Sequence, residues 1–172
     1  MIPTPDRRAS VVVPIGDATR NMVVHDWGDE RNPRVAICVH GLSRNGRDFD
    51  VVAPALADGY RVLCPDIPGR GESDWYASAA DYTIPNYIAA IHAMFTQLGV
   101  SRYDWIGTSM GGAIGTVCAA GLFEPRLHGR IRSLLLNDNA PRLADAALER
   151  IKSYAGQPPA FDTVAELEAF FR

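Results

Sequence analysis

A serine near the middle of the chain has the sequence setting of a nucleophile. Ser109 lies between two glycines in the segment Gly107-Thr108-Ser109-Met110-Gly111. The apolar run 103–106 before it predicts a strand, and the small residues 112–120 after it predict a helix. Between a strand and a helix, this spacing is typical of a strained turn that exposes the serine hydroxyl. The pattern predicts attack of Ser109 on a substrate carbonyl; the alternative is a serine that only caps the helix.

A second segment could stabilise the negative charge that such an attack creates. His40-Gly41-Leu42 follows the apolar run 34–39, which predicts a buried strand. If this strand neighbours that of Ser109, the backbone N–H of Leu42 and that of Met110 are candidates for an oxyanion hole. We interpret His40 itself as structural, a histidine hydrogen-bonded within a glycine turn.

A third segment, Asp66-Ile-Pro-Gly-Arg-Gly-Glu-Ser73, follows the strand predicted at 60–64. Its two glycines and its proline predict a tight loop at the same edge of the sheet. Asp66 and Arg70 could form a buried ion pair that shapes this loop, and we favour that structural role over a chemical one.

Strand and helix patterns alternate along the chain. We expect strands at 10–15 and 22–27, joined as a hairpin, and at 34–39, 60–64, 103–106 and 131–136, the last of them buried. Helical spacing appears in Phe49, Val52 and Leu56 before Gly59, and again at 84–98. The alternation predicts an α/β fold, a mostly parallel sheet with helices on both faces. After Pro141 two helices are expected, one through Leu143, Ala147, Ile151 and Tyr154, and one opening with a capping box at 163–166.

The three motifs, in this order and spacing, resemble the α/β-hydrolase superfamily, in the branch with a helical cap inserted after the sixth strand. The resemblance runs from about Val23 to the end of the chain. It implies that Ser109 is the nucleophile of a carboxylesterase-like serine hydrolase, with the N–H groups of Leu42 and Met110 as oxyanion donors. It implies a small, uncharged ester, lactone or related carbonyl substrate, and no cofactor or metal. Residues 1–141 would be the N-terminal part of the core and 142–172 the start of the cap.

Members of this family carry an acid and then a histidine after the cap. The histidines here are His25, His40, His92 and His128, and none lies where the family places its base. Asp138, after the strand 131–136, is a possible acid, with a loop-shaping or cap-contacting role as the alternative. The last helix has a start signal and no stop signal. We therefore expect a longer natural polypeptide, cut here within the cap, whose C-terminal portion supplies the base.

The composition sets further bounds. The chain has 172 residues, of which 47% are hydrophobic and 22% charged, with a net charge of −3. Its basic residues are scattered, which argues against nucleic acid and anionic membranes as partners. No signal peptide is visible, and three distant cysteines in apolar segments (Cys38, Cys64, Cys118) predict reduced thiols in a cytoplasmic protein. Two alternatives stay open: a non-catalytic ligand-binding or interaction module, and an inert fragment that requires complementation.

Overall fold

The computed structural model describes residues 3–139, 145–154 and 160–170. The chain divides into two compact units, Met1–Pro141 and Arg142–Arg172. The assignment of the second unit to a cap stays a prediction. None of the helices in the described ranges is long and apolar enough to cross a membrane.

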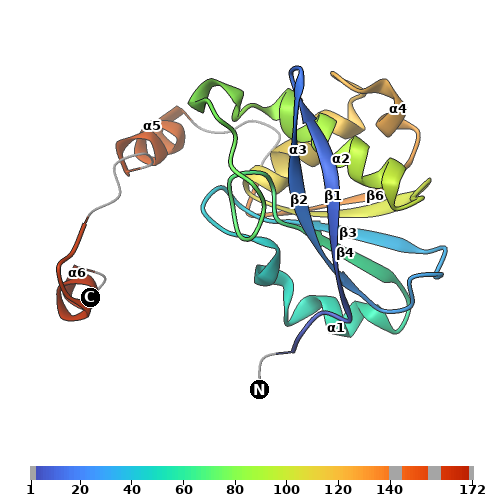
Figure 1. The fold of residues 1–172 in the computed structure, drawn as a ribbon, viewed down its shortest axis with the longest axis horizontal. Coiled ribbons are helices and arrows are strands. Elements are labelled where there is room, and N and C mark those ends of the chain that lie inside the picture. The colour runs from blue at the N-terminus through green and yellow to red at the C-terminus, as the bar shows by residue number, and fades with distance from the viewer. Residues whose placement is uncertain (1–2, 140–144, 155–159, 171–172) are drawn as a thin grey trace. The chain divides into compact units, whose positions relative to one another are not determined.

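The first unit is built on a six-stranded sheet with the strand order β1-β2-β4-β3-β5-β6 (Figure 1). The strands are β1 (Arg7–Ile15), β2 (Ala18–Trp27), β3 (Val35–Val39), β4 (Arg61–Pro65), β5 (Tyr103–Thr108) and β6 (Ile131–Asn137). β1 and β2 form the expected hairpin, and β2 joins β4 antiparallel. β4, β3, β5 and β6 pair in parallel, which confirms the mostly parallel sheet.

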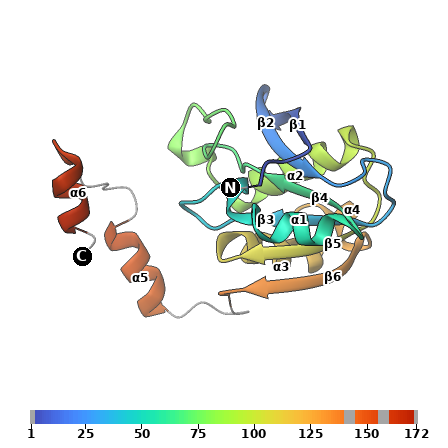
Figure 2. The same cartoon turned by 90° about the horizontal axis from the view of Figure 1, so that it is seen from below.

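Helices cover both faces of this sheet, as predicted (Figures 1 and 2). α2 (Ile84–Gln97), α3 (Met110–Ala119) and α4 (Pro125–His128) pack on one face, where their apolar residues join the larger core cluster. The other face is covered by α1 (Val52–Ala57) and the short 3-10 helix η1 (Gly46–Phe49). A second 3-10 helix, η2 (Ala79–Asp81), precedes α2.

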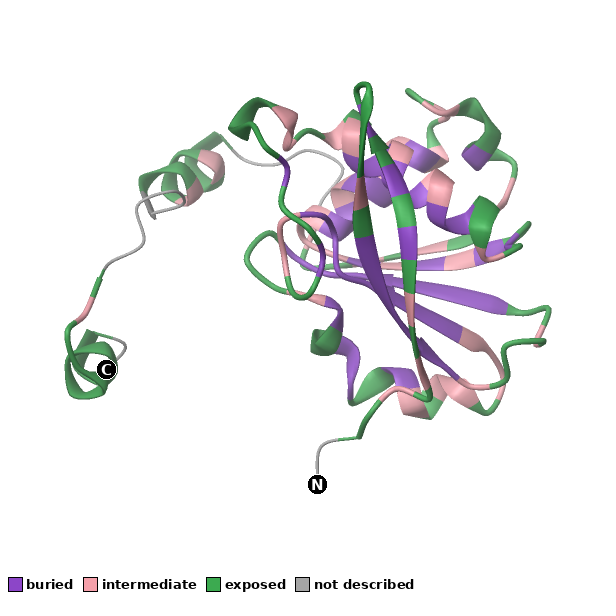
Figure 3. Cartoon of the chain, viewed as in Figure 1, coloured by how far each residue is buried: buried purple, intermediate pink, exposed green. Residues whose placement is uncertain are grey.

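Strand β3 shows why its sequence is apolar at every position. All five of its residues are buried (Figure 3). Val35, Ile37 and Val39 belong to the cluster under α2 and α3, whereas Ala36 and Cys38 belong to the cluster under α1. Because side chains alternate between the faces of a strand, a strand covered on both sides needs a continuous apolar run.

Two expectations about burial are wrong. Strand β6 is not buried throughout, since Leu135 is 53% exposed while Leu134 packs against the core. β6 is the last strand of the sheet, so its second face receives no cover from α1. Val52 was expected in an apolar helical stripe, yet it is 45% exposed, because Phe49 ends a separate 3-10 helix and the helix α1 begins only at Val52.

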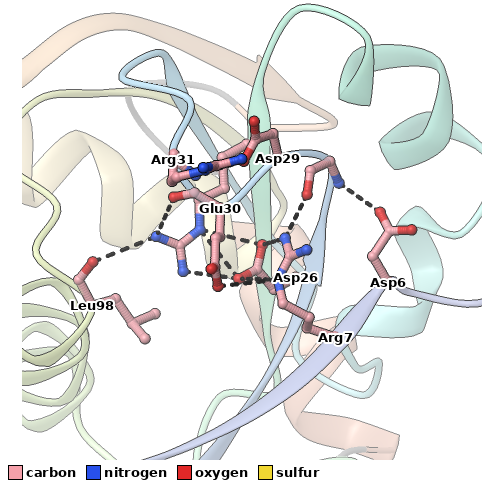
Figure 4. A network of polar contacts seen from close by, with 9 residues as sticks. Asp6, Arg7, Asp26, Asp29, Glu30, Arg31 and Leu98 are labelled. Atoms are coloured by element: carbon pink, nitrogen blue, oxygen red, sulfur yellow. Dashed lines mark hydrogen bonds and ion pairs between the residues drawn. The ribbon is translucent and has the colours of Figure 1, made fainter.

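A buried carboxylate ties the hairpin to the parallel part of the sheet (Figure 4). Asp26 on β2 lies 2.9 Å from Nη2 of Arg7 on β1 and 2.8 Å from Nη2 of Arg61 on β4. The Asp26 side chain is only 3% exposed, so the two guanidinium groups compensate a charge that is removed from water.

The second unit contains α5 (Asp145–Tyr154) and α6 (Val164–Phe170). The predicted capping box of α6 is confirmed: the Glu166 N–H donates to Thr163 Oγ1 at 3.2 Å, and the Glu166 carboxylate accepts from the Thr163 N–H. Leu143, predicted in the first of these helices, lies outside the described residues.

Candidate active site

Ser109 occupies a sharp turn between β5 and α3. Its backbone has φ 49° and ψ −112°, a left-handed conformation that costs a non-glycine residue about 1–3 kcal/mol. Hydrogen bonds on both sides hold it there: the Ser109 N–H donates to the Asn137 carbonyl, and the Ser109 carbonyl accepts from the Ala113 N–H, both at 3.0 Å. The Ser109 hydroxyl has no hydrogen-bond partner among the described residues. The hydroxyl therefore does not cap helix α3 and is free to react.

The glycines two residues on either side of Ser109 are required by close backbone approach. A Cβ added to Gly107 would lie 2.5 Å from the Gly111 carbonyl oxygen. A Cβ added to Gly111 would overlap the carbonyl of Val39 at the end of β3. No side chain fits at either position, which explains the two glycines of the motif and brings the turn against the neighbouring strand.

The other sequence motifs meet Ser109 at this edge, where the parallel strands end. β3 is the neighbour of β5, and a Cβ on Gly41, just beyond β3, would lie 3.6 Å from the Ser109 Cβ. Met110 is the first residue of α3, so its N–H has no acceptor within the helix. The Leu42 N–H likewise donates to none of the described residues. Both predicted oxyanion donors thus have no acceptor among the described residues, and they belong to the residue that follows Ser109 and the residue that follows Gly41.

His40 holds the Leu42 peptide and is not a base for Ser109. Its Nδ1 lies 2.7 Å from the Gly41 carbonyl oxygen, and its Nε2 accepts from the Ile67 N–H at 3.0 Å. Nε2 is an acceptor, so the proton is on Nδ1 and the ring is neutral. Burial lowers the pKa of His40, which keeps it neutral. Because the Gly41 carbonyl and the Leu42 N–H belong to one planar peptide, fixing the carbonyl also fixes the direction of the N–H.

The predicted ion pair between Asp66 and Arg70 is wrong. Asp66 lies 3.3 Å from His25 Nε2 and accepts from the N–H groups of Gly46 and Glu72 at 2.7 and 2.8 Å. Burial alone would raise the pKa of Asp66, but the hydrogen bonds from His25 and from these two N–H groups lower it below its ordinary value. Asp66 therefore shapes the loop, as expected, but through backbone donors and a histidine, since Arg70 points elsewhere.

Arg70 turns toward the two residues that carry the predicted oxyanion donors. Its Nε donates to the Leu42 carbonyl at 3.0 Å, and its Nη2 lies 3.9 Å from the Met110 sulfur. Nη1 donates to the Pro68 carbonyl and to the Tyr87 hydroxyl. No local sequence pattern indicates this position of Arg70, because only the fold brings Tyr87 and Leu42 to the loop that carries it.

The remaining histidines lie away from Ser109. His25 is buried on β2 beside Asp66. His92 on α2 lies 3.6 Å from Glu124, and His128 contacts the carbonyl of Ala119 at the far end of α3. These three and His40 are the four histidines of the sequence. No histidine of the chain is therefore placed to accept the proton of Ser109.

Asp138 lies directly after β6, at the edge of the sheet where the parallel strands end. It is exposed and has φ 52°. The residue before it, Asn137, accepts the Ser109 N–H and donates to Thr108 Oγ1 at 3.2 Å. The backbone of this turn therefore supports the nucleophile, and the acid role of Asp138 stays a prediction.

The cysteines offer no competing nucleophile. Cys38, Cys64 and Cys118 are free thiols and are all buried, as the sequence indicated. Burial raises the pKa of Cys64 well above its ordinary value and that of Cys118 to about 12. Both thiols are therefore protonated and inaccessible.

Comparison with known proteins agrees with this geometry. A family model described as "alpha/beta hydrolase fold" matches residues 35–165. A 3-hydroxybutyrate-oligomer hydrolase from Cupriavidus necator is 48% identical over 151 residues, which are 88% of this chain and 50% of that protein. A serine hydrolase-like protein from Danio rerio is 30% identical over 65% of this chain and 32% of its own length. The crystal structure of an alpha/beta hydrolase from Novosphingobium aromaticivorans superposes with a TM-score of 0.76 at 36% identity, covering 91% of this chain and 53% of that one. The chain thus spans between about a third and just over half of the length of these relatives.

Proposed function

Because the chain belongs to the alpha/beta hydrolase family, we propose that it carries the nucleophile of a serine hydrolase, Ser109. The single observation that carries the proposal is the strained turn that presents an unpartnered hydroxyl beside two unengaged N–H groups. Catalytic serines of this fold occupy such a turn.

In the proposed reaction Ser109 Oγ attacks the carbonyl carbon of an ester, and its proton passes to a general base. The N–H groups of Leu42 and Met110 hold the oxygen that becomes negative, which can lower the barrier by several kcal/mol. The alcohol leaves, and water then releases the acyl group from Ser109. These steps require no metal or organic cofactor.

For the substrate we propose an ester of a small hydroxy acid, with short linear oligomers of 3-hydroxybutyrate as the first compounds to test. The support is the identity of 48% with the hydrolase from Cupriavidus necator. A carboxylesterase-like activity on other small esters or lactones is the broader form of the same proposal. The residue at the turn is a serine, which disfavours dehalogenase and epoxide-hydrolase chemistry, since those reactions use a carboxylate there.

The general base is proposed to come from a C-terminal portion of the same polypeptide. Two observations support this: both ring nitrogens of His40 are engaged by the backbone while the other three histidines have their partners elsewhere, and the chain covers about half of the relatives it matches. Without a base, a serine hydroxyl is a poor nucleophile at neutral pH. The 172 residues alone should therefore show little turnover.

Labelling with a fluorophosphonate tests the proposal. The protein at its natural length should react at Ser109, identified by mass spectrometry of the labelled peptide, and Ser109→Ala should abolish the adduct. Ser101→Ala is the matched control, because Ser101 is exposed before β5, at the opposite end of the strand from Ser109. A natural-length protein that hydrolyses no ester and takes no label would contradict the proposal.

One observation favours a second candidate, a non-catalytic binding module: none of the four histidines, all of which lie in the described ranges, is placed to accept the proton of Ser109. An inert fragment is distinguished from such a module by complementation. Adding the C-terminal portion should restore ester cleavage to a fragment, whereas a binding module stays inactive.

A further inference from the structure

Arg70 carries a positive charge that no acidic side chain compensates. Within the described part of the chain, Arg70 forms no ion pair with an acidic side chain, in contrast to the half-buried Arg61, which pairs with Asp26. Its hydrogen bonds go instead to the carbonyls of Leu42 and Pro68 and to the Tyr87 hydroxyl. A half-buried cation with neutral partners only is electrostatically open to an anion.

This cation contacts both residues that carry the predicted oxyanion donors. Arg70 contacts Leu42 through its Nε and Met110 through its Nη2, and these two residues flank Ser109 in the predicted oxyanion hole. Its Nη2 has only the sulfur contact of 3.9 Å, which is weak compared with an N–H···O bond. The N–H groups of Nη2 are therefore available to a better acceptor.

The guanidinium group is also held in place. Nη1 donates at 2.8 Å to the hydroxyl of Tyr87, which is buried on α2. The guanidinium carbon lies 5.3 Å from the centre of the Tyr87 ring and 5.7 Å from that of Tyr82, within the range of cation–π attraction. An arginine fixed in this way loses little conformational entropy when it binds a ligand.

The geometry points to Arg70 as the group that recognises a carboxylate on the substrate, with its free Nη2 N–H groups donating to that carboxylate next to the ester under attack. This inference rests on the proposed function, and it narrows the substrate to esters that carry their own acid end. These 172 residues have a net charge of −3, so within them the attraction of an anion must come from a local group. An anionic substrate differs from the uncharged one that the sequence predicts, and the reason for the difference is Arg70.

A purely structural role for Arg70 is the competing explanation, because the same side chain supports the Leu42 carbonyl. The two roles differ in one measurable respect. If Arg70 only supports the loop, its loss should weaken the binding of charged and neutral substrates alike. If it binds a carboxylate, its loss should weaken the binding of the charged substrate only.

Binding to the Ser109→Ala variant of the natural-length protein separates them, because this variant cannot consume the ligand. The probes are the linear dimer of 3-hydroxybutyrate as free acid and its methyl ester, measured by titration calorimetry. We expect the acid to bind about 10- to 100-fold more tightly, the range for a charge-assisted hydrogen bond. Adding Arg70→Gln should remove this preference, and Arg70→Lys should restore part of it.

Arg102→Gln provides the matched control, since it removes the same charge at an exposed position before β5, at the far end of that strand. It should leave the preference for the acid unchanged. Equal binding of acid and ester, binding of neither, or an equal loss of both in Arg70→Gln would overturn the inference. If the preference is found but the wild-type protein hydrolyses neither compound, the proposed function fails and the carboxylate site stands.

Discussion

Replacing Ser109 by glycine should make the protein more stable while removing its nucleophile. The φ of 49° at Ser109 is maintained by hydrogen bonds to Asn137 and from Ala113, so the strain is stored in the folded state. Glycine adopts this conformation freely, which releases about 1–3 kcal/mol, while its more flexible unfolded chain costs about 0.5–1 kcal/mol. The free energy of unfolding of Ser109→Gly should therefore rise, by up to about 2.5 kcal/mol.

Urea unfolding of three variants measures this effect. Ser109→Ala keeps the strain and loses a hydroxyl that has no described partner, so it should stay within about 0.5 kcal/mol of the wild type. Ala113→Gly, inside α3, should lose about 1 kcal/mol, the ordinary cost of glycine in a helix. The reasoning is refuted if Ser109→Gly is less stable than Ser109→Ala, because glycine would then behave at this turn as it does in the helix.

Three further predictions concern the support of the site and of the sheet. Gly111→Ala should destabilise the protein by more than about 2 kcal/mol in urea unfolding, because its Cβ would overlap the backbone of β3, while Gly129→Ala, with open space around it, should stay within about 0.5 kcal/mol. Burial lowers the pKa of His40 in the folded protein, so as the pH falls the unfolded chain takes up a proton on this histidine before the folded one does. The free energy of unfolding of the wild type should therefore fall between about pH 7 and pH 5. In His40→Gln, this contribution to the pH dependence of unfolding should be missing. Asp26→Asn should cost about 2–4 kcal/mol by leaving two arginines without their buried partner, whereas the exposed Asp29→Asn should change the free energy of unfolding by less than about 0.5 kcal/mol, and equal effects would contradict a buried pair.

The sequence predicted the elements better than it predicted their arrangement. Apolar periodicity located all six strands and the helix α2 to within a few residues, because burial on one or both faces determines the residue types along each element. The strand order, in which β4 precedes β3, results from crossover connections that leave no local pattern. The exposed face of β6 was missed for a similar reason, since Leu135 looks like a buried residue until its neighbours are known.

The candidate site was predictable where its signal is local. Gly107 and Gly111 are explained by backbone contacts that a short motif already implies. The partners of Asp66 and Arg70 were not predictable, because both residues lie in one loop and their opposite charges favour a pair between them. Their actual partners, His25 and Tyr87, come from β2 and α2, and only the folded chain brings these elements together.

Trapping the acyl-enzyme tests the central claim most directly. The natural-length protein would be mixed with p-nitrophenyl butyrate, quenched in acid within milliseconds, and mapped by peptide mass spectrometry. The account predicts a burst of p-nitrophenolate equal to the enzyme concentration and a butyryl group on the peptide that contains Ser109. Hydrolysis that proceeds with the acyl group on another residue, or unchanged in Ser109→Ala, would contradict it.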